Sequence, residues 1–152
     1  MSAERFTLDT NILVYSIDAR EAAKRETAAR VVEKAVRLDC PLALQAVGEF
    51  YVAATTKLKL EAKDAARRAE LLIASFETFA HSKTAVQAAM NEASKGRFSF
   101  WDGLLLASAA EAGCTHILSE DMTDGARFGS VIVVNPFAGN DISGPAKDLL
   151  AL

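Results

Sequence analysis

Two acidic segments that are far apart in the chain stand where strands are expected to end. Asp9 follows a short apolar run, Arg5 to Leu8, and Asp121 follows a second such run, Thr115 to Leu118. In open sheets of parallel strands, sites form at the carboxyl ends of the strands. We therefore expect the two carboxylates to share one edge of a sheet, where oxygen donors of this kind bind divalent cations.

Each of these acids also has a simpler explanation. Asp9, or Thr10 beside it, is a good cap for the short helix predicted to follow. Asp121 lies in a polar segment, SEDMTDG, which is typical of a turn after a strand. The same segment contains Glu120 and Asp124, either of which could replace or assist Asp121. We favour Asp121 for its position relative to the strand end.

Glu49 and Asp102 are acids within predicted helices. Glu49, in LQAVGEFYVAATT, lies at the border of an apolar stripe, where an ordinary boundary residue would reach water. Asp102, in RFSFWDGLLLASAAEAG, follows Ser99 with the spacing of a capping box. Its large apolar neighbours indicate burial, and a buried carboxylate without a cation is costly. Cap and metal ligand are compatible roles, because a helix N-terminus also stabilises an anion.

The elements that would position these acids follow an α/β pattern, in which short apolar runs alternate with longer helical stretches. Five strands are expected, at Arg5–Leu8, Leu42–Leu44, Glu77–Ala80, Thr115–Leu118 and Val131–Val134. Helices are expected at Asn11–Ile17, Arg20–Leu38, around Val47–Ala54, and at Glu61–Ser75, Thr84–Ser94 and Ser99–Ala112. Residues 1–152 form a single predicted domain, and residues 139–152 form a tail that caps it, irregular except for a final helical turn.

Composition narrows the class of protein. The net charge of −3 argues weakly against nucleic acid as a partner, although bound divalent cations would neutralise part of it. No apolar run reaches the ~18 residues that a membrane helix needs, and the N-terminus does not resemble a signal peptide. We expect a cytoplasmic protein with no membrane partner. Cys40 and Cys114 form no CxxC pair, and we expect reduced thiols in or near the core.

Four segments carry a resemblance to a known family: LDTNILVY, VGEFY, FWDGLLLASA and ILSEDMTDG, in this order. Together they resemble the PIN-domain family, and more narrowly the VapC toxins of bacterial toxin–antitoxin pairs. The resemblance spans Phe6 to about Pro136. It implies a PIN-like α/β fold, with a central parallel sheet of about five short strands and helices on both faces.

The resemblance also implies roles for particular residues. Asp9, Glu49, Asp102 and Asp121 would be the catalytic acids. The metal ligands would be Asp9, Asp102 and Asp121, supported through hydrogen bonds by Asn11 and Ser119. Hard oxygen ligands favour Mg²⁺ or Mn²⁺. The implied reaction is endonucleolytic hydrolysis of RNA by a metal-activated water.

The implied partners are an RNA substrate, a cognate antitoxin protein and a second copy of the chain in a homodimer. Lys95 and Arg97 precede Asp102 and are the favoured RNA-binding residues, since a phosphate contact there would position the strand. A second basic group is more typical of a solvated helix face: Lys57, Lys59, Lys63, Arg67 and Arg68. Two alternatives stay open: a housekeeping PIN nuclease of RNA processing or decay, and a non-catalytic module that binds metal and RNA.

Overall fold

Seven helices alternate with short strands in the computed structural model, which describes residues 4–152. The helices are α1 (Thr10–Tyr15), α2 (Ala22–Arg37), α3 (Leu44–Thr56), α4 (Ala62–Ser75), α5 (Lys83–Ser94), α6 (Phe100–Glu111) and α7 (Gly144–Leu150). The strands are β1 (Phe6–Leu8), β2 (Pro41–Ala43), β3 (Glu77–Phe79), β4 (His116–Leu118), β5 (Arg127–Phe128), β6 (Val131–Val134), β7 (Phe137–Ala138) and β8 (Asp141–Ile142).

The central sheet is mostly parallel and has the strand order β1-β4-β6-β5, with β5 antiparallel to β6. Its parallel strands end in register, with Leu8 opposite Leu118 and Leu118 opposite Val134. β2 and β3 form a separate parallel pair. This pair lies beside β1, where the Thr7 hydroxyl donates a 2.7 Å hydrogen bond to the carbonyl of Pro41. The carboxyl ends of β1 and β4 therefore meet at one edge.

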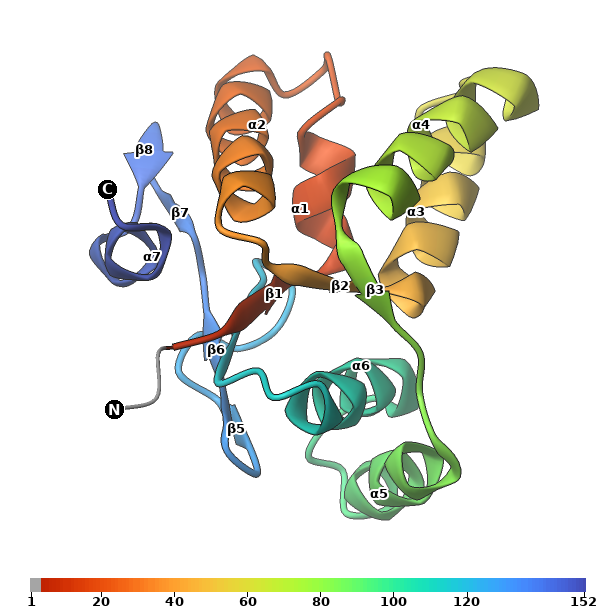
Figure 1. Ribbon diagram of the computed structural model, residues 1–152, viewed down its shortest axis with the longest axis vertical. Helices are drawn as coiled ribbons and strands as arrows, with labels where there is room; N and C mark the ends of the chain where they lie inside the picture. The colour runs from red at the N-terminus through yellow and green to blue at the C-terminus, as the bar shows by residue number, and fades with distance from the viewer. Residues whose placement is uncertain (1–3) are drawn as a thin grey trace.

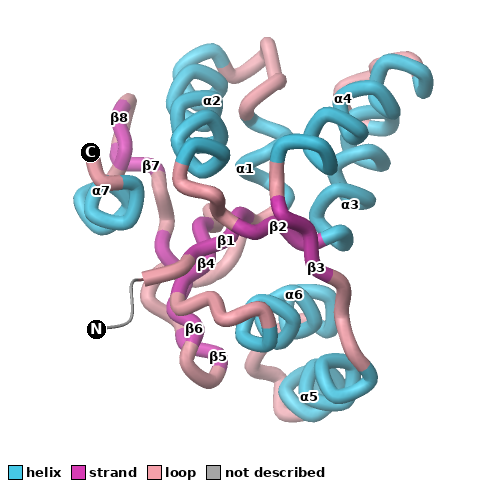
Figure 2. The backbone as a smooth tube through the Cα atoms, viewed as in Figure 1, coloured by secondary structure: helices cyan, strands magenta, loops and turns pink. Residues whose placement is uncertain are grey.

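The two faces of the sheet are covered by different sets of helices. Figure 1 shows α1 to α4 on one side of the strands and α5 and α6 on the other. In Figure 2 the strands run between these two layers. The core lies between the layers: Leu8, Ile117, Leu118 and Val133 are fully buried. On one face, α6 is buried along most of its length, because α5 packs over its outer side, close to Gly103.

This architecture confirms the predicted α/β fold. All five expected strands are present, with ends that differ from the prediction by a single residue at most. The five parallel strands form two groups instead of one continuous hydrogen-bonded sheet, and β5 adds an antiparallel edge. β5 was not predicted because a strand of two residues carries no alternating pattern.

The C-terminal tail is more regular than the sequence indicated. β7 and β8 form a hairpin, and α7 follows with Ser143 as its N-cap. The tail caps α2, where Arg30 pairs with Asp141 at 3.5 Å. Buried Ile142 and Leu150 anchor it to the core. The expectation of an irregular tail was wrong because the strands are too short to show a period in the sequence.

Two further expectations concern the cysteines and the membrane. Cys40 and Cys114 are both unbonded and buried, as expected for core thiols. Burial raises the pKa of both thiols, that of Cys114 to about 11, so neither is a reactive thiolate. None of the helices within residues 4–152 is long and apolar enough to cross a membrane.

Candidate active site

Asp9 is the most firmly held acid at the sheet edge. Its backbone N–H donates to the carbonyl of Leu118 at 2.9 Å, so the ends of β1 and β4 are joined at this residue. Its carboxylate accepts hydrogen bonds from the Thr10 N–H at 2.7 Å and the Ser119 hydroxyl at 2.7 Å. With 7% of its surface exposed, burial raises the pKa of Asp9 to about 6, despite these donors. The charges of Asp102 and Asp121 make smaller contributions to the same rise.

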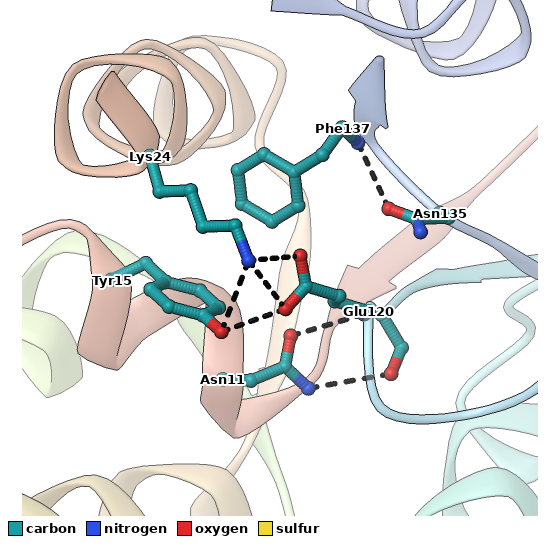
Figure 3. A network of polar contacts seen from close by, with 7 residues as sticks. Asn11, Tyr15, Lys24, Glu120, Asn135 and Phe137 are labelled. Carbon is teal, nitrogen blue, oxygen red and sulfur yellow. Dashed lines mark hydrogen bonds and ion pairs between the residues drawn. The ribbon is translucent and has the colours of Figure 1, made fainter. Parts of the chain in front are cut away.

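Asn11 and Ser119 support Asp9. The Asn11 amide nitrogen donates to Asp9 Oδ2 at 3.0 Å. The Asn11 carbonyl oxygen accepts from the Glu120 N–H at 3.1 Å, as Figure 3 shows. Ser119 is fully buried, and its hydroxyl also accepts from the Met122 N–H at 3.2 Å. The first turn of α1 and the turn after β4 are thus linked through the carboxylate of Asp9.

Glu49 reaches the same region from α3, and its side chain is exposed. Its Oε1 accepts hydrogen bonds from the Thr10 hydroxyl at 3.4 Å and from the Gln45 amide at 3.2 Å. The Gln45 amide also donates to the Trp101 carbonyl at 3.0 Å, which joins α3 to the start of α6. Gln45 was not identified from the sequence. It stands one helical turn before Glu49, and that spacing could have revealed it.

Asp102 lies in the first turn of α6 and is partly buried. Its backbone N–H donates to the hydroxyl of the N-cap Ser99 at 3.2 Å, so the predicted cap is present. Its carboxyl group also faces the cavity described below. Burial raises the pKa of Asp102, the Ser99 hydrogen bond lowers it, and the charge of Asp121 raises it again. Asp102 therefore lies at the cavity, and its backbone N–H is the group that the Ser99 side chain caps.

The three acids that follow β4 are directed to different places. Asp121 is exposed and lines the cavity. Glu120 does not line it. The Glu120 carboxylate lies 2.7 Å from the Lys24 ammonium and accepts from the Tyr15 hydroxyl at 2.7 Å (Figure 3). Asp124 accepts from the Asn135 N–H at 2.8 Å, at the far end of the turn. Asp121 is thus the acid of this segment that meets the other three.

One open cavity of about 410 Å³ brings the four candidate acids together. Its charged lining residues are Asp9, Asp18, Arg20, Glu21, Glu49, Lys57, Asp102 and Asp121. Arg20 is already paired with Asp18, at 2.9 and 3.0 Å. Lys57 makes no ion pair with any residue between 4 and 152. It follows Glu49 and Ala53 at successive four-residue steps, a same-face spacing that could have marked it.

Lys95 and Arg97, the favoured RNA-binding residues, do not line this cavity. Both pair with Glu92 at the end of α5, at 3.9 Å and 3.2 Å respectively. Gly96 between them has φ +72°, which ends the helix and turns the chain towards α6. Lys95 and Arg97 are therefore close to Asp102 in the sequence but do not line the cavity.

The four carboxylates suit a metal by their chemistry. They provide hard oxygen donors, and Asp9 and Asp102 have raised pKa values because they are buried near other acids. None of the four forms an ion pair with a basic side chain of residues 4–152. In the same residues, no group of three or more His, Cys, Asp or Glu is gathered closely enough to hold an ion as it stands. The donor set fits a divalent cation, and uncompensated carboxylates repel one another.

The structure is an α/β domain in which acids gather at the carboxyl edge of the parallel strands, and these features can be compared with known families. The model of the PIN domain family matches residues 6–123, which is more than half of the chain. The chain therefore belongs to the PIN domain family, as its four sequence segments indicated.

Solved structures show the same fold. The FitAcB structure from Neisseria gonorrhoeae is 18% identical, with a TM-score of 0.63, and the match covers 86% of this chain and 97% of that one. DNA-bound VapBC from Salmonella typhimurium is 17% identical, with a TM-score of 0.60 and coverage of 86% and 96%. VapC20 from Mycobacterium tuberculosis, described as a sarcin-ricin loop cleaving toxin, is 16% identical, with a TM-score of 0.57 and coverage of 76% and 89%. A search of the curated proteins found no match.

Proposed function

We propose that this PIN domain is a metal-dependent endoribonuclease and the toxin of a toxin–antitoxin pair. The observation that carries the proposal is the meeting of Asp9, Glu49, Asp102 and Asp121 at one cavity, with none of the four paired to a basic side chain of residues 4–152. These acids come from four separate parts of the chain. A purely structural role would not require that they converge, because converging carboxylates repel one another.

The chain's own residues have distinct parts in the reaction. Asp9, Asp102 and Asp121 would hold Mg²⁺ or Mn²⁺. When bound, such an ion lowers the pKa of a water molecule and offsets negative charge on the phosphate. Asn11 and Ser119 keep the Asp9 carboxylate in one orientation through hydrogen bonds of 3.0 and 2.7 Å. Glu49 would accept a proton at Oε2 from the attacking water, since its hydrogen bonds engage Oε1.

RNA is the substrate that we propose. The neighbour described as a sarcin-ricin loop cleaving toxin supports this choice. Lys57, at the cavity and without an ion pair in the described residues, would contact a phosphate of the bound strand. Lys95 and Arg97 would contact a more distant phosphate, outside the cavity. We also propose that the protein acts in the cytoplasm.

Two protein partners complete the proposal. An antitoxin is supported by the neighbours, which include a toxin–antitoxin complex from Klebsiella pneumoniae. A homodimer is supported by exposed apolar side chains on α3 and α5, where Val52 is 55% and Met90 52% exposed. Both expectations are open to direct measurement: co-purification with the product of an adjacent small reading frame, and light scattering at micromolar concentration.

The test of function is inducible expression of the wild type and of Asp9→Ala in a bacterium, with mapping of new RNA 5′ ends. The proposal predicts growth arrest and new 5′-phosphate ends with the wild type alone, and relief by the antitoxin. A housekeeping nuclease would produce new ends without arrest. Unchanged RNA after expression of folded wild-type protein would overturn the nuclease assignment.

A further inference from the structure

Lys24 forms an unusually complete set of contacts for a residue at the molecular surface. Its ammonium group lies 2.7 Å from Glu120 Oε2 and 2.9 Å from Oε1. It also lies 3.4 Å from the Tyr15 hydroxyl, 4.7 Å from the centre of the Tyr15 ring and 5.6 Å from that of Phe137 (Figure 3). The two rings meet edge to face at 5.5 Å. Charge-assisted hydrogen bonds and cation–π contacts thus act together on one side chain.

The partner of Lys24 lies in the turn that carries the acid of the cavity. Glu120 stands between Ser119, which donates to Asp9, and Asp121, which lines the cavity. The Asp121 side chain makes no hydrogen bond or ion pair with any residue of 4–152. Its position therefore depends on how firmly its neighbours hold the turn. The backbone of Glu120 is held by the hydrogen bond that its N–H donates to Asn11. The Glu120 side chain is held by hydrogen bonds from Lys24 and Tyr15.

The contacts also reach beyond the segment that the family model matches. Lys24 comes from α2, Tyr15 from α1 and Phe137 from β7, which follows the matched residues 6–123. Phe137 is fixed in turn, because its N–H donates to the Asn135 side chain at 3.0 Å (Figure 3). Strand β7, which leads into the C-terminal tail, thus contributes one wall around the Lys24 ammonium.

We propose that Lys24 is a positioning residue for the active site: clamped between Tyr15 and Phe137, it anchors Glu120 and thereby fixes the adjacent Asp121 at the cavity. The expected effect on catalysis rests on the proposed function. The expected effect on the turn that carries Asp121 rests on the contacts of Lys24 alone. Without the ammonium, the partly buried Glu120 carboxylate loses its counter-charge. It then leaves its place, and the turn that carries Asp121 loosens.

Three variants test the clamp: Lys24→Met removes the charge, Lys24→Arg keeps it, and Glu120→Gln keeps the shape of its partner. The matched control is Arg30→Met. It removes a different ion pair of α2, the one that Arg30 forms with Asp141 of the C-terminal tail. Amide hydrogen exchange in metal-free protein gives a readout that requires no activity. We expect the Glu120 and Met122 amides to exchange at least about tenfold faster in Lys24→Met, and to be unchanged in Arg30→Met and nearly restored in Lys24→Arg.

The second readout is Mn²⁺ affinity, measured by calorimetry without RNA, together with kcat and KM for a short RNA. Lys24→Met should weaken Mn²⁺ binding and lower kcat, each about tenfold, with KM for RNA kept. Glu120→Gln should show a smaller loss, and Lys24→Arg should recover most of the wild-type values. If Lys24→Met does not fold, Glu120→Gln and Phe137→Ala carry the same test.

Unchanged exchange in folded Lys24→Met would overturn the clamp, as would equal losses in Arg30→Met, which would mean that any ion pair of this helix has the same effect. A wild type that neither binds Mn²⁺ nor cleaves RNA would overturn the proposed function, while the exchange rates would still decide whether Lys24 holds the turn.

Discussion

The candidate active-site cavity has a side built on strand ends and a side built on helices, and Asp9 on the first side is held more firmly than Glu49 on the second. Asp9, at the end of β1, is 7% exposed and accepts hydrogen bonds from Thr10, Asn11 and Ser119. Glu49, on α3, is exposed, and its contacts with Thr10 and Gln45 are 3.4 and 3.2 Å long. The Asp9 carboxylate is thus held in one place by its neighbours, whereas the Glu49 carboxylate keeps freedom to adjust.

The difference follows from how each acid is attached. Strand ends are fixed by backbone hydrogen bonds between neighbouring strands. The Asp9 N–H donates to the Leu118 carbonyl, and the Ser119 N–H donates to the Val134 carbonyl. A residue on α3 is fixed to its helix, but within residues 4–152 the side-chain hydrogen bond that joins this helix to α6 comes from the Gln45 amide nitrogen. The amide oxygen of Gln45 is buried without a partner in the same residues. We therefore expect substitutions at Asp9 and its hydrogen-bond partners to have larger effects than those at Glu49 and Gln45.

The largest effect is expected at Asp9. Asp9→Asn keeps the size of the side chain and replaces a carboxylate oxygen, so cleavage of RNA should fall by at least about a thousandfold at saturating Mn²⁺. Glu49→Gln on the helix side should lose less, because Glu49 is not among the proposed metal ligands. Single-turnover cleavage of one RNA by both variants provides the measurement. Equal losses, or a larger loss at Glu49, would contradict the contrast between the two sides.

The pH dependence of stability tests the burial of Asp9. Its folded pKa, about 6, lies above the ordinary 3.8, so between these values the folded state binds the proton more tightly than the unfolded chain does. Metal-free protein should therefore lose stability as the pH rises from about 4 to about 6. The difference between the two pKa values corresponds to a loss of about 3 kcal/mol in the free energy of unfolding.

Asp9→Asn isolates this contribution, because it lacks the titrating group and keeps the rest of the chain. Urea unfolding of both proteins, without metal, should show the variant more stable than the wild type at pH 7.5 and the difference vanishing near pH 4. A difference that is independent of pH would mean that the Asp9 carboxylate is not desolvated as the structure indicates.

A smaller effect is expected from the residue that orients Asp9. Ser119→Ala removes the 2.7 Å donor to Oδ2 and leaves the Met122 N–H without its acceptor. Losses of about 10- to 100-fold in metal affinity or activity are typical of such supporting residues. Mn²⁺ titration by calorimetry checks this, and Ser108→Ala, a buried serine that bonds only within α6, serves as the control. Equal behaviour of the two serine variants would remove the supporting role.

The smallest effect is expected at Gln45, on the helix side. Gln45→Ala deletes its hydrogen bonds to Glu49 and to the Trp101 carbonyl, and we expect kcat to fall only a few-fold, on the order of one such hydrogen bond. A loss as large as that of Ser119→Ala would show that both sides of the cavity are equally preorganised.

The sequence predicted the strand side well because its signals are local. An apolar run that stops at an acid marks a strand end, and parallel strands end at one edge, so Asp9 and Asp121 could be placed together. The choice between Glu120 and Asp121 is different. It depends on the direction of two successive side chains, and on Lys24, which is 96 residues away in the chain.

The basic residues were the weakest part of the sequence interpretation. Lys95 and Arg97 were favoured because they precede Asp102, but the turn at Gly96 brings them to Glu92 instead. Lys57 was grouped with a solvated helix face, although its spacing from Glu49 places it on the same side of α3. The pattern of basic residues in the sequence could not show which of them line the cavity. Where a helix ends and which acid a basic side chain pairs with decide where its charge lies.

The converging acids are proposed to form a metal site, and Asp102 gives the most direct test because it also lies in the first turn of α6, next to the N-cap interaction with Ser99. Asp102→Asn keeps the backbone N–H that donates to Ser99 but removes the side-chain charge. The measurement is the melting temperature with and without Mn²⁺, together with RNA cleavage over a range of Mn²⁺ concentrations. We predict that metal-free stability holds or rises, because repulsion from Asp121 is relieved, while the Mn²⁺-induced stabilisation and the cleavage both collapse. Near-normal cleavage by a well-folded Asp102→Asn protein would contradict the metal site as a whole.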